Sequence, residues 1–299
     1  MRLSTCVLPV HRWTDGGREV WRRAEQLGFH TAYTYDHLSW RPPFRDGPWF
    51  GAVPTLAAAA GVTSRVRLGT LVSSPNFRDP VTLAKELISL DDLSEGRITL
   101  GIGAGSSGAD ATVLGREAWS PAERADRYAE FVELLDTLLT QDVTSHSGRY
   151  YAARDARNMP GCVQRPRLPF AVAATGSRGM RLAARYGQAW VTTGDRRVLE
   201  DPAATAEQSR TALARQVERL ATACAEEGRG ADEGPRRILL AGFTPDQVLD
   251  SVAAFVDFAG AHGRLGFDEI VLHWPLPDSR FAADQAVFER IATEGLAQL

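Results

Sequence analysis

The 299-residue chain is predicted to be an α/β protein that folds as a single (β/α)8 barrel, the TIM-barrel architecture. Two observations predict this fold. Short β-forming runs alternate with helical patterns from end to end and make eight strand–helix units. The strand runs are apolar over most of their length, as expected for parallel strands that are buried on both faces. A doubly wound sheet in two halves is the competing topology.

The eight predicted strands are short and are spread over the whole chain. In order, they are residues 3–8, 31–36, 66–72, 97–102, 169–174, 189–193, 236–243 and 267–274.

The helices between these strands carry recognisable start signals. Asp79 and Pro80 open the third helix as an N-cap and first-turn pair. The fourth begins with Ser120-Pro121-x-Glu123, which predicts a capping box, and apolar residues repeat at helical spacing from there to Leu139. The other helices are predicted at 20–27, up to Gly61, up to Tyr186, and at 204–227, 245–261 and 281–296.

Residues 141–168 interrupt this rhythm, because they lack strong periodicity and contain glycine, proline and arginine. We interpret them as an insertion loop between the fourth helix and the fifth strand, within one domain that spans residues 1–299. The predicted architecture is therefore a TIM barrel with one insertion.

Composition excludes several classes of protein. The chain is 44% hydrophobic and 24% charged, with a formal net charge of -3, so no basic field recruits nucleic acid. Its three cysteines, Cys6, Cys162 and Cys224, lack the spacing of a zinc site or a disulfide framework, and no metal is expected. The N-terminus becomes polar too soon for a signal peptide, and no stretch approaches the ~18 apolar residues of a membrane span. We expect a cytoplasmic protein that acts on a small molecule.

Polar and glycine-rich clusters fall at the carboxyl ends of the predicted strands, where barrel enzymes carry their active sites. These clusters are Asp36-His37, Ser73-Ser74, Gly103–Ser106, Ala174–Gly179, Thr192-Thr193 and His273-Trp274.

One of these clusters, residues 103–108, satisfies the dinucleotide-binding pattern G-x-G-x-x-G. That fingerprint belongs in the first βα unit of its domain, with a carboxylate ending the next strand ~20 residues later. Here it follows the fourth strand, and the acidic residue at about that distance, Glu123, lies in a helix cap. The context argues against a Rossmann site, although the glycines still let a ligand approach the backbone closely.

The stretch 67–105, RLGTLVSSPNFRDPVTLAKELISLDDLSEGRITLGIGAG, closely resembles the luciferase-like monooxygenase superfamily of flavin- and deazaflavin-dependent oxidoreductases. Residues 24–37 and 181–194 extend the resemblance, which covers most of residues 1–195 and is looser beyond them. The resemblance implies a TIM barrel with an insertion, in agreement with the strand count, and a homodimer.

The resemblance also implies a cofactor site at the barrel mouth. The ring would lie against a bulge in the third strand, often made by a non-proline cis peptide, and the matching bond is Leu71–Val72. The cofactor phosphate would lie on the loop after the fifth strand, where helix N–H groups and an arginine suit an anion; a plain N-cap is the alternative. The implied cofactor-binding residues are Asp36, Leu71, Val72, Ser73, Ser74, Gly103, Ala104, Gly105, Ser106, Ala174, Thr175, Gly176, Ser177, Arg178, Gly179 and Met180.

Three residues are implied to take part in the chemistry. His37 would lie beside the reactive face of the cofactor, and a histidine that titrates near pH ~6.5 can donate or accept a proton. His273 matches a histidine of some members and is a second candidate for the proton. Trp40 is a candidate lid or substrate wall. Sugar-phosphate dehydrogenases of this group carry a glutamate where this chain has Ser106, and lysines are very few, which argues against a sugar-phosphate substrate.

The Asp-His pair and the TGSRGM loop resemble the deazaflavin branch, so coenzyme F420 is the expected cofactor and FMN the alternative. The expected reaction is hydride transfer between F420 and a small organic or natural-product substrate, at a C=C, C=N or alcohol carbon. Arg178, Arg41 and Arg45 are candidates to meet the coenzyme's acidic tail. Two other interpretations remain open: an FMN-dependent monooxygenase that uses O2 and externally supplied reduced FMN, and a non-catalytic flavin-binding member.

Overall fold

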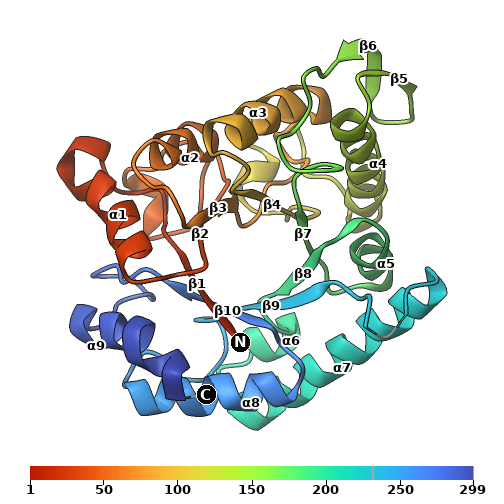
Figure 1. Cartoon of the computed structure of the whole chain (residues 1–299). Helices are drawn as coiled ribbons and strands as arrows, with labels where there is room; N and C mark the ends of the chain where they lie inside the picture. The colour runs from red at the N-terminus through yellow and green to blue at the C-terminus, as the bar shows by residue number, and fades with distance from the viewer. Residues whose placement is uncertain (231, 299) are drawn as a thin grey trace.

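Eight parallel strands close into a barrel in the computed structural model of the chain, which describes residues 1–230 and 232–298. Their order around the barrel is β1-β10-β9-β8-β7-β4-β3-β2, and helices surround them (Figure 1). This closed barrel confirms the predicted fold and excludes the doubly wound sheet. The strands are β1 (Arg2–Cys6), β2 (Thr31–Thr34), β3 (Arg67–Thr70), β4 (Ile98–Ile102), β7 (Phe170–Ala173), β8 (Ala189–Thr192), β9 (Arg236–Leu240) and β10 (Glu269–His273).

The predicted helices are present on the outside of the barrel, with one short addition between β8 and the long helix that follows. Their bounds are α1 (Arg18–Gln26), α2 (Ala52–Ala60), α3 (Pro80–Leu93), α4 (Pro121–Thr140), α5 (Ser177–Tyr186), the added α6 (Arg196–Leu199), α7 (Ala206–Glu226), α8 (Val252–Arg264) and α9 (Gln285–Arg290).

The caps confirm one predicted helix start and correct others. Asp79 accepts the N–H groups of the first turn of α3. Ser120 caps α4, but the Glu123 side chain contacts Arg127 instead of turning back, so only half of the capping box forms. The two last helices begin later than predicted, α8 after Ser251 and α9 after Asp284, because side-chain oxygens cap them there.

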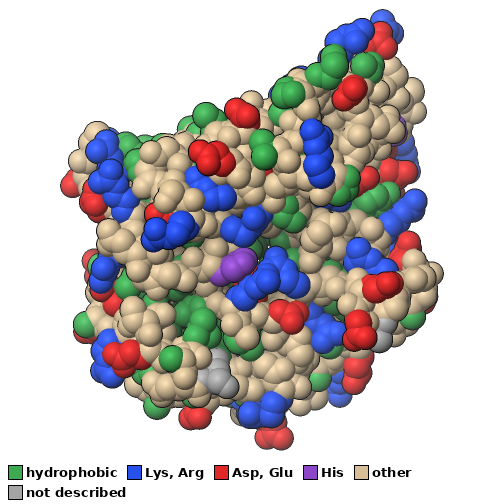
Figure 2. Space-filling view, in the orientation of Figure 1, with side chains coloured by type: hydrophobic (Ala, Val, Ile, Leu, Met, Phe, Trp, Pro, Cys, Tyr) green, Lys and Arg blue, Asp and Glu red, His purple; other side chains and the backbone are tan. Residues whose placement is uncertain are grey.

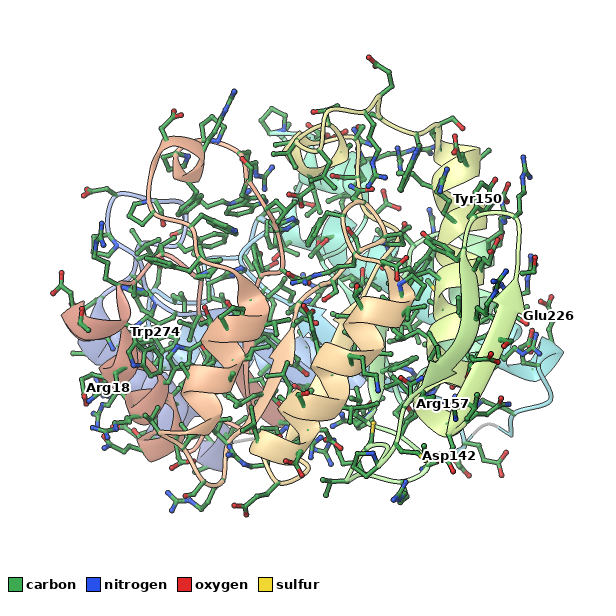
Figure 3. All side chains as sticks on the ribbon, turned by 90° about the horizontal axis from the view of Figure 1, so that it is seen from above. Arg18, Asp142, Tyr150, Arg157, Glu226 and Trp274 are labelled. Atoms are coloured by element: carbon green, nitrogen blue, oxygen red, sulfur yellow. The ribbon has the colours of Figure 1, made fainter. Side chains whose placement is uncertain are left out.

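The insertion is an antiparallel hairpin rather than the plain loop that we expected. Strands β5 (Val143–Ser147) and β6 (Ala152–Arg157) pair beside α4, and Figure 3 shows Tyr150 at one end of this hairpin and Arg157 at the other. The ring of Tyr151 packs edge-on against Phe131 of α4, with 5.6 Å between the ring centroids. The period of two in this short polar segment was too weak a pattern to predict the strands.

The interior of the barrel is filled by alternate residues of its strands, whereas the opposite faces of the strands pack against the helices. At the end where the strands finish, four interior side chains face the mouth of the barrel: Tyr35, Leu71, Val191 and Leu240. The strands therefore supply a rigid apolar floor for anything bound at the mouth. None of the helices within the described ranges has the length and apolar character needed to cross a bilayer.

The opposite end of the barrel, where the strands begin, is rich in arginine. The N-terminus lies near the centre of Figure 1, and in the same view Figure 2 shows lysine or arginine side chains around a histidine. Arg67 begins β3 and donates to the carbonyl oxygens of Gly96 and Ile98.

A buried carboxylate lies at the same end of the barrel. Glu269, at the start of β10, is fully buried and accepts from Ser4 Oγ at 2.6 Å. Its pKa is raised by burial.

Candidate active site

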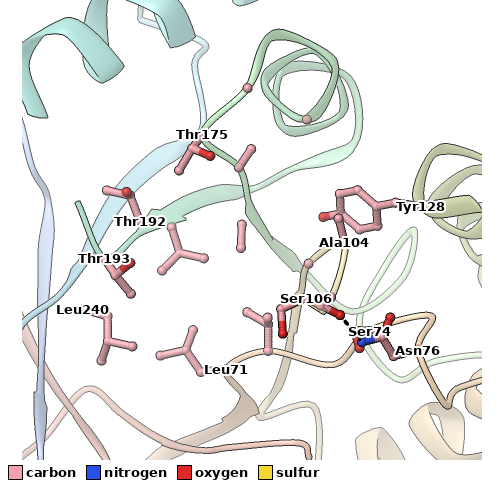
Figure 4. A pocket seen from close by; sticks show the side chains of 18 of the residues that line it. Leu71, Ser74, Asn76, Ala104, Ser106, Tyr128, Thr175, Thr192, Thr193 and Leu240 are labelled. Carbon is pink, nitrogen blue, oxygen red and sulfur yellow. Dashed lines mark hydrogen bonds between the residues drawn. The ribbon is translucent and has the colours of Figure 1, made fainter. Parts of the chain in front are cut away.

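A cavity of about 730 Å³ opens at the carboxyl ends of the strands. A volume of roughly 300–1,000 Å³ is typical of sites that hold a small molecule or cofactor. Figure 4 shows residues from widely separated parts of the chain around it, among them Leu71, Ser106, Thr175 and Leu240. The convergence of these segments is the geometry that a barrel-mouth site requires.

Most of the predicted site residues line this cavity. They are His37, Trp40, Leu71, Val72, Ser74, Gly103, Ala104, Gly105, Ser106, Ala174, Thr175, Gly176, Ser177, Arg178 and Gly179.

Four predicted residues do not line it: Asp36, Ser73, Met180 and His273. The Asp36 carboxylate is buried and accepts from Ser73 Oγ at 2.6 Å and from Arg78 Nη2 at 2.7 Å, so it supports the wall rather than forming it. Met180 packs in the core between strands and helices.

The third strand ends as expected, with a cis peptide bond between Leu71 and Val72. Beyond it, the N–H of Ser73 donates to the carbonyl oxygen of Gly101 at 2.8 Å, and that of Gly103 donates to the carbonyl oxygen of Ser73 at 2.9 Å. The end of β3 is thereby held against the end of β4, with the Val72 side chain at the cavity wall.

The glycines of the G-x-G-x-x-G stretch allow this contact. A Cβ added to Gly103 would lie 2.9 Å from a methyl carbon of Val72. Gly105 has a φ of +74°, and an added Cβ would lie 2.6 Å from the Asn76 side-chain oxygen. Both positions favour glycine because a side chain would have to push Val72 or Asn76 aside, and Gly105 also because of its backbone conformation. These glycines bring two strand ends together beside the cavity.

His37 is held by a carboxylate that the sequence did not single out. Its Nδ1 contacts Asp110, which lies on the 3-10 turn Ala109–Ala111 after β4. Asp110 also accepts the N–H groups of Leu38 at 2.8 Å and Ser39 at 3.0 Å. An ionised carboxylate only accepts hydrogen bonds, so Nδ1 carries the hydrogen and Nε2 is left to exchange a proton. The arrangement fixes both the tautomer and the orientation of the imidazole.

His273 lies behind the cavity wall rather than in it. Its ring is buried and stacks on Phe281, with 3.7 Å between centroids. Its Nδ1 donates to the Ala241 carbonyl oxygen at 3.1 Å, so Nε2 accepts from the Tyr35 hydroxyl at 2.8 Å. Burial lowers the pKa of His273 to about 3. The side chain that reaches the cavity at this place is Tyr35.

The loop after β7, to which the resemblance assigns the cofactor phosphate, lines the cavity. Gly176 caps α5 without a side-chain hydrogen bond, which leaves the first N–H groups of this helix for another acceptor. An added Cβ at Gly179 would lie 2.9 Å from the Cβ of Ala174, so the turn is closely packed. Arg178 reaches the cavity but contacts Asp126 of α4, so its charge is already partly compensated.

Several lining residues were missed by the sequence analysis, notably Tyr35, Asn76, Asp110, Tyr128 and Phe243. Tyr35 directly precedes the Asp-His pair, and Asn76 lies in the same stretch as Ser74, so position alone could have indicated them. Tyr128 belongs to the apolar repeat of α4 and cannot be told from a core residue by its spacing; its hydroxyl donates to the Ile102 carbonyl oxygen at 2.8 Å.

The structure is thus a TIM barrel with a cavity at the carboxyl ends of its strands. The chain belongs to the luciferase-like monooxygenase family, whose model matches residues 14–230.

Two curated proteins illustrate its relatives. Over 174 residues, 57% of this chain, it is 38% identical to an F420-dependent glucose-6-phosphate dehydrogenase of Beutenbergia cavernae. Over 247 residues, 80% of this chain, it is 32% identical to the 4-hydroxyprotoasukamycin monooxygenase of Streptomyces nodosus subsp. asukaensis. The chain spans about half the length of the first relative (50%) and 63% of the second.

Among solved structures, the chain resembles an F420-dependent secondary alcohol dehydrogenase in complex with an F420-acetone adduct. The TM-score is 0.79 at 17% sequence identity, and the match covers 98% of this chain and 100% of the other. At this identity the likeness shows the fold.

Proposed function

We propose that the protein is an F420-dependent oxidoreductase that transfers a hydride between the deazaflavin and a small organic substrate. The observation that carries the proposal is the shared cavity: His37, oriented by Asp110, faces the same space as Val72 and the first turn of α5. The names of a curated relative and of a structural neighbour, both F420-dependent dehydrogenases, support it.

The polar groups and the apolar walls of the cavity fit a planar ring with a phosphorylated tail. The side-chain oxygen of Asn76 is buried and has no hydrogen-bond partner in the described residues, while its nitrogen donates to the Ser106 carbonyl oxygen at 3.0 Å. A ring N–H would satisfy that oxygen. At the other end, the N–H groups of α5 and Arg178 suit an anion. Between them, Leu71, Val72 and Leu240 provide apolar contact.

When bound, F420 supplies two-electron hydride chemistry at its ring. The protein would supply position, exclusion of water and one proton. His37 would give or take that proton through Nε2, with Asp110 stabilising the protonated imidazolium. Trp40, which stacks on Phe44 with 4.9 Å between centroids, would close the substrate side against water.

Ser106 argues for a substrate other than a sugar phosphate. The resemblance places a glutamate of the sugar-phosphate dehydrogenases at this position, and Ser106 here offers no acid. We therefore expect the B. cavernae relative and this chain to share cofactor and fold but to differ in substrate.

One observation favours a second candidate, an FMN-dependent monooxygenase: the relative that aligns over the larger part of this chain is named as a monooxygenase. Turnover distinguishes the two. A panel of alcohols, enones and imines is supplied anaerobically with F420 or F420H2, and the deazaflavin absorbance is followed. In parallel, reduced FMN is supplied with oxygen, and substrate-dependent oxygen consumption is recorded.

Substrate-dependent bleaching or recovery of F420 absorbance supports the proposal. Oxygen consumption with reduced FMN and no change with F420 would favour the monooxygenase. The variant His37→Gln is measured in both the F420 assay and the oxygen-consumption assay. Cofactor binding without turnover in any arm, and no effect of that variant, would indicate a member that only binds a flavin.

A further inference from the structure

The arginine at the proposed phosphate position already contacts a carboxylate of the protein. Arg178 lies in the first turn of α5 and lines the cavity, and its Nη2 donates to Oδ1 of Asp126 on α4. This contact lowers the pKa of Asp126, so the carboxylate is ionised at neutral pH. Asp126 does not line the cavity, although Ala125 and Tyr128 of the same helix do. Arg178 is thus paired with an anion that lies outside the cavity.

The cavity leaves hydrogen-bonding groups of the protein without partners. Gly176 caps the ten-residue helix α5 without a side-chain hydrogen bond, so the first N–H groups of the helix need an acceptor from elsewhere. In the same cavity, the side-chain oxygen of Asn76 is buried and has no partner among the described residues. Because buried polar groups are normally satisfied, both observations indicate that a ligand completes these hydrogen bonds.

The pair between Arg178 and Asp126 can be exchanged at little cost. The two side chains are 48% and 32% exposed, and ion pairs of this kind typically contribute little to stability. A phosphate can accept two parallel N–H···O bonds from one guanidinium, in addition to those from a helix N-terminus. Asp126 would keep a second cation, because its Oδ2 lies 3.7 Å from Nη1 of Arg149 in the turn between β5 and β6.

We propose that Asp126 is an internal competitor for Arg178, which the phosphate of the ligand displaces on binding. In the free protein Arg178 pairs with Asp126. In the complex it donates to the phosphate together with the first N–H groups of α5, and Asp126 stays with Arg149. The affinity for phosphate-bearing ligands is lowered by the pair that has to be broken. The phosphate position rests on the proposed function, but the role of Asp126 is the same whichever ring carries the phosphate.

The test uses two pairs of ligands that differ only in a phosphate: the tail-less deazaflavin nucleoside and its 5′-phosphate, and riboflavin and FMN. Fluorescence titrations at one low ionic strength compare the wild type with Asp126→Asn and with Glu123→Gln. This control removes the same charge from the same helix, at a residue that pairs with Arg127. Asp126→Asn is expected to tighten binding of the phosphate compound ~3-fold or more and to leave the nucleoside unchanged. The control is expected to have neither effect.

A double variant separates exchange of the partner from simple charge repulsion. Arg178→Gln is expected to weaken binding of the phosphate compound, and adding Asp126→Asn to it should then give much less gain than in the wild type. An equal gain in both backgrounds would mean that Asp126 acts by repulsion alone, and the proposal would be wrong. Unchanged affinity in the single variant Asp126→Asn would overturn it as well.

The two rings keep this result apart from that of the proposed function. If only riboflavin and FMN bind, the proposed cofactor is wrong, and the FMN affinities still decide the role of Asp126. If the deazaflavins bind and Asp126→Asn changes nothing, the proposed function stands and the competitor is refuted. If neither phosphate compound binds the wild type more tightly than its nucleoside, Asp126 has no phosphate to compete with, and the proposal is wrong.

Discussion

The two ends of the barrel use arginine in opposite ways. Where the strands begin, Arg97 donates to the carbonyl oxygens of Ala60, Thr63 and Val66, and the fully buried Glu269 collects its own donors. Where the strands end, Arg41 and Arg280 lie over aromatic faces without a carboxylate partner within the described ranges. One end is closed by its own hydrogen bonds, and the other leaves charge and N–H groups for a ligand. We therefore expect substitutions at the first end to change stability and substitutions at the second to change ligand binding and chemistry.

The largest expected effect is on chemistry at the mouth. His37→Gln removes the group proposed to exchange the proton, so kcat is expected to fall by roughly 10²–10⁴-fold. The affinity for F420 should stay nearly unchanged, because the phosphate and ring contacts remain. Steady-state kinetics with the substrate found by the panel, together with an F420 titration, measure both. An unchanged kcat would remove His37 from the mechanism.

At the opposite end, the expected effect is on stability alone. Glu269→Ala leaves Ser4 Oγ and Arg236 without their partner and opens a cavity, which should lower the free energy of unfolding by about 3 kcal/mol. F420 affinity should not change. Denaturant unfolding measures the loss, and Glu269→Gln, which still accepts from Ser4, should lose less. A loss of F420 affinity without a loss of stability would contradict the claim that this end of the barrel affects stability and not cofactor binding.

The glycine contact beside the cavity allows a matched comparison. Gly105→Ala should cost about 1–3 kcal/mol of stability, because it adds a clash with Asn76 to the strain of a positive φ. Gly115→Ala has nearly the same φ, +77°, with nothing within 4 Å of the added Cβ, so it should cost less. The difference between the two variants, measured by thermal unfolding, isolates the Asn76 contact. Equal losses would show that this contact carries no energy.

The smallest effect depends on pH. The pKa of His273 is about 3 in the folded protein against 6.5 for a free histidine, so the unfolded chain binds the extra proton below pH 6.5. Stability is therefore lost as the pH falls through 6.5 towards 3. Between pH 7.5 and 5.5 this amounts to about 1.4 kcal/mol. His273→Gln, which still offers a donor to Ala241 and an acceptor to Tyr35, should flatten the profile by that amount. An unchanged profile would mean that His273 is not buried in its neutral form.

The sequence was sufficient for the barrel and for most of the mouth, because both follow from periodicity and from the ends of strands. Gly103 and Thr175 were selected because each follows a predicted strand, whereas Val72 was selected because the resemblance implies a cis peptide at Leu71–Val72. The sequence did not predict which side chains contact each other from distant parts of the chain. Asp110 is 73 positions away from His37 in the chain, and nothing local to either residue predicts their contact. In the same way, nothing local to His273 predicts its hydrogen bond with Tyr35, the residue that lines the cavity in its place.

Titration of the purified protein with F420 and, separately, with FMN tests the central claim that the mouth of this barrel holds the deazaflavin. The account predicts that F420 changes its absorption spectrum on binding and has a Kd at least ~10-fold lower than that of FMN. Tight binding of FMN with no spectral response from F420 would contradict it.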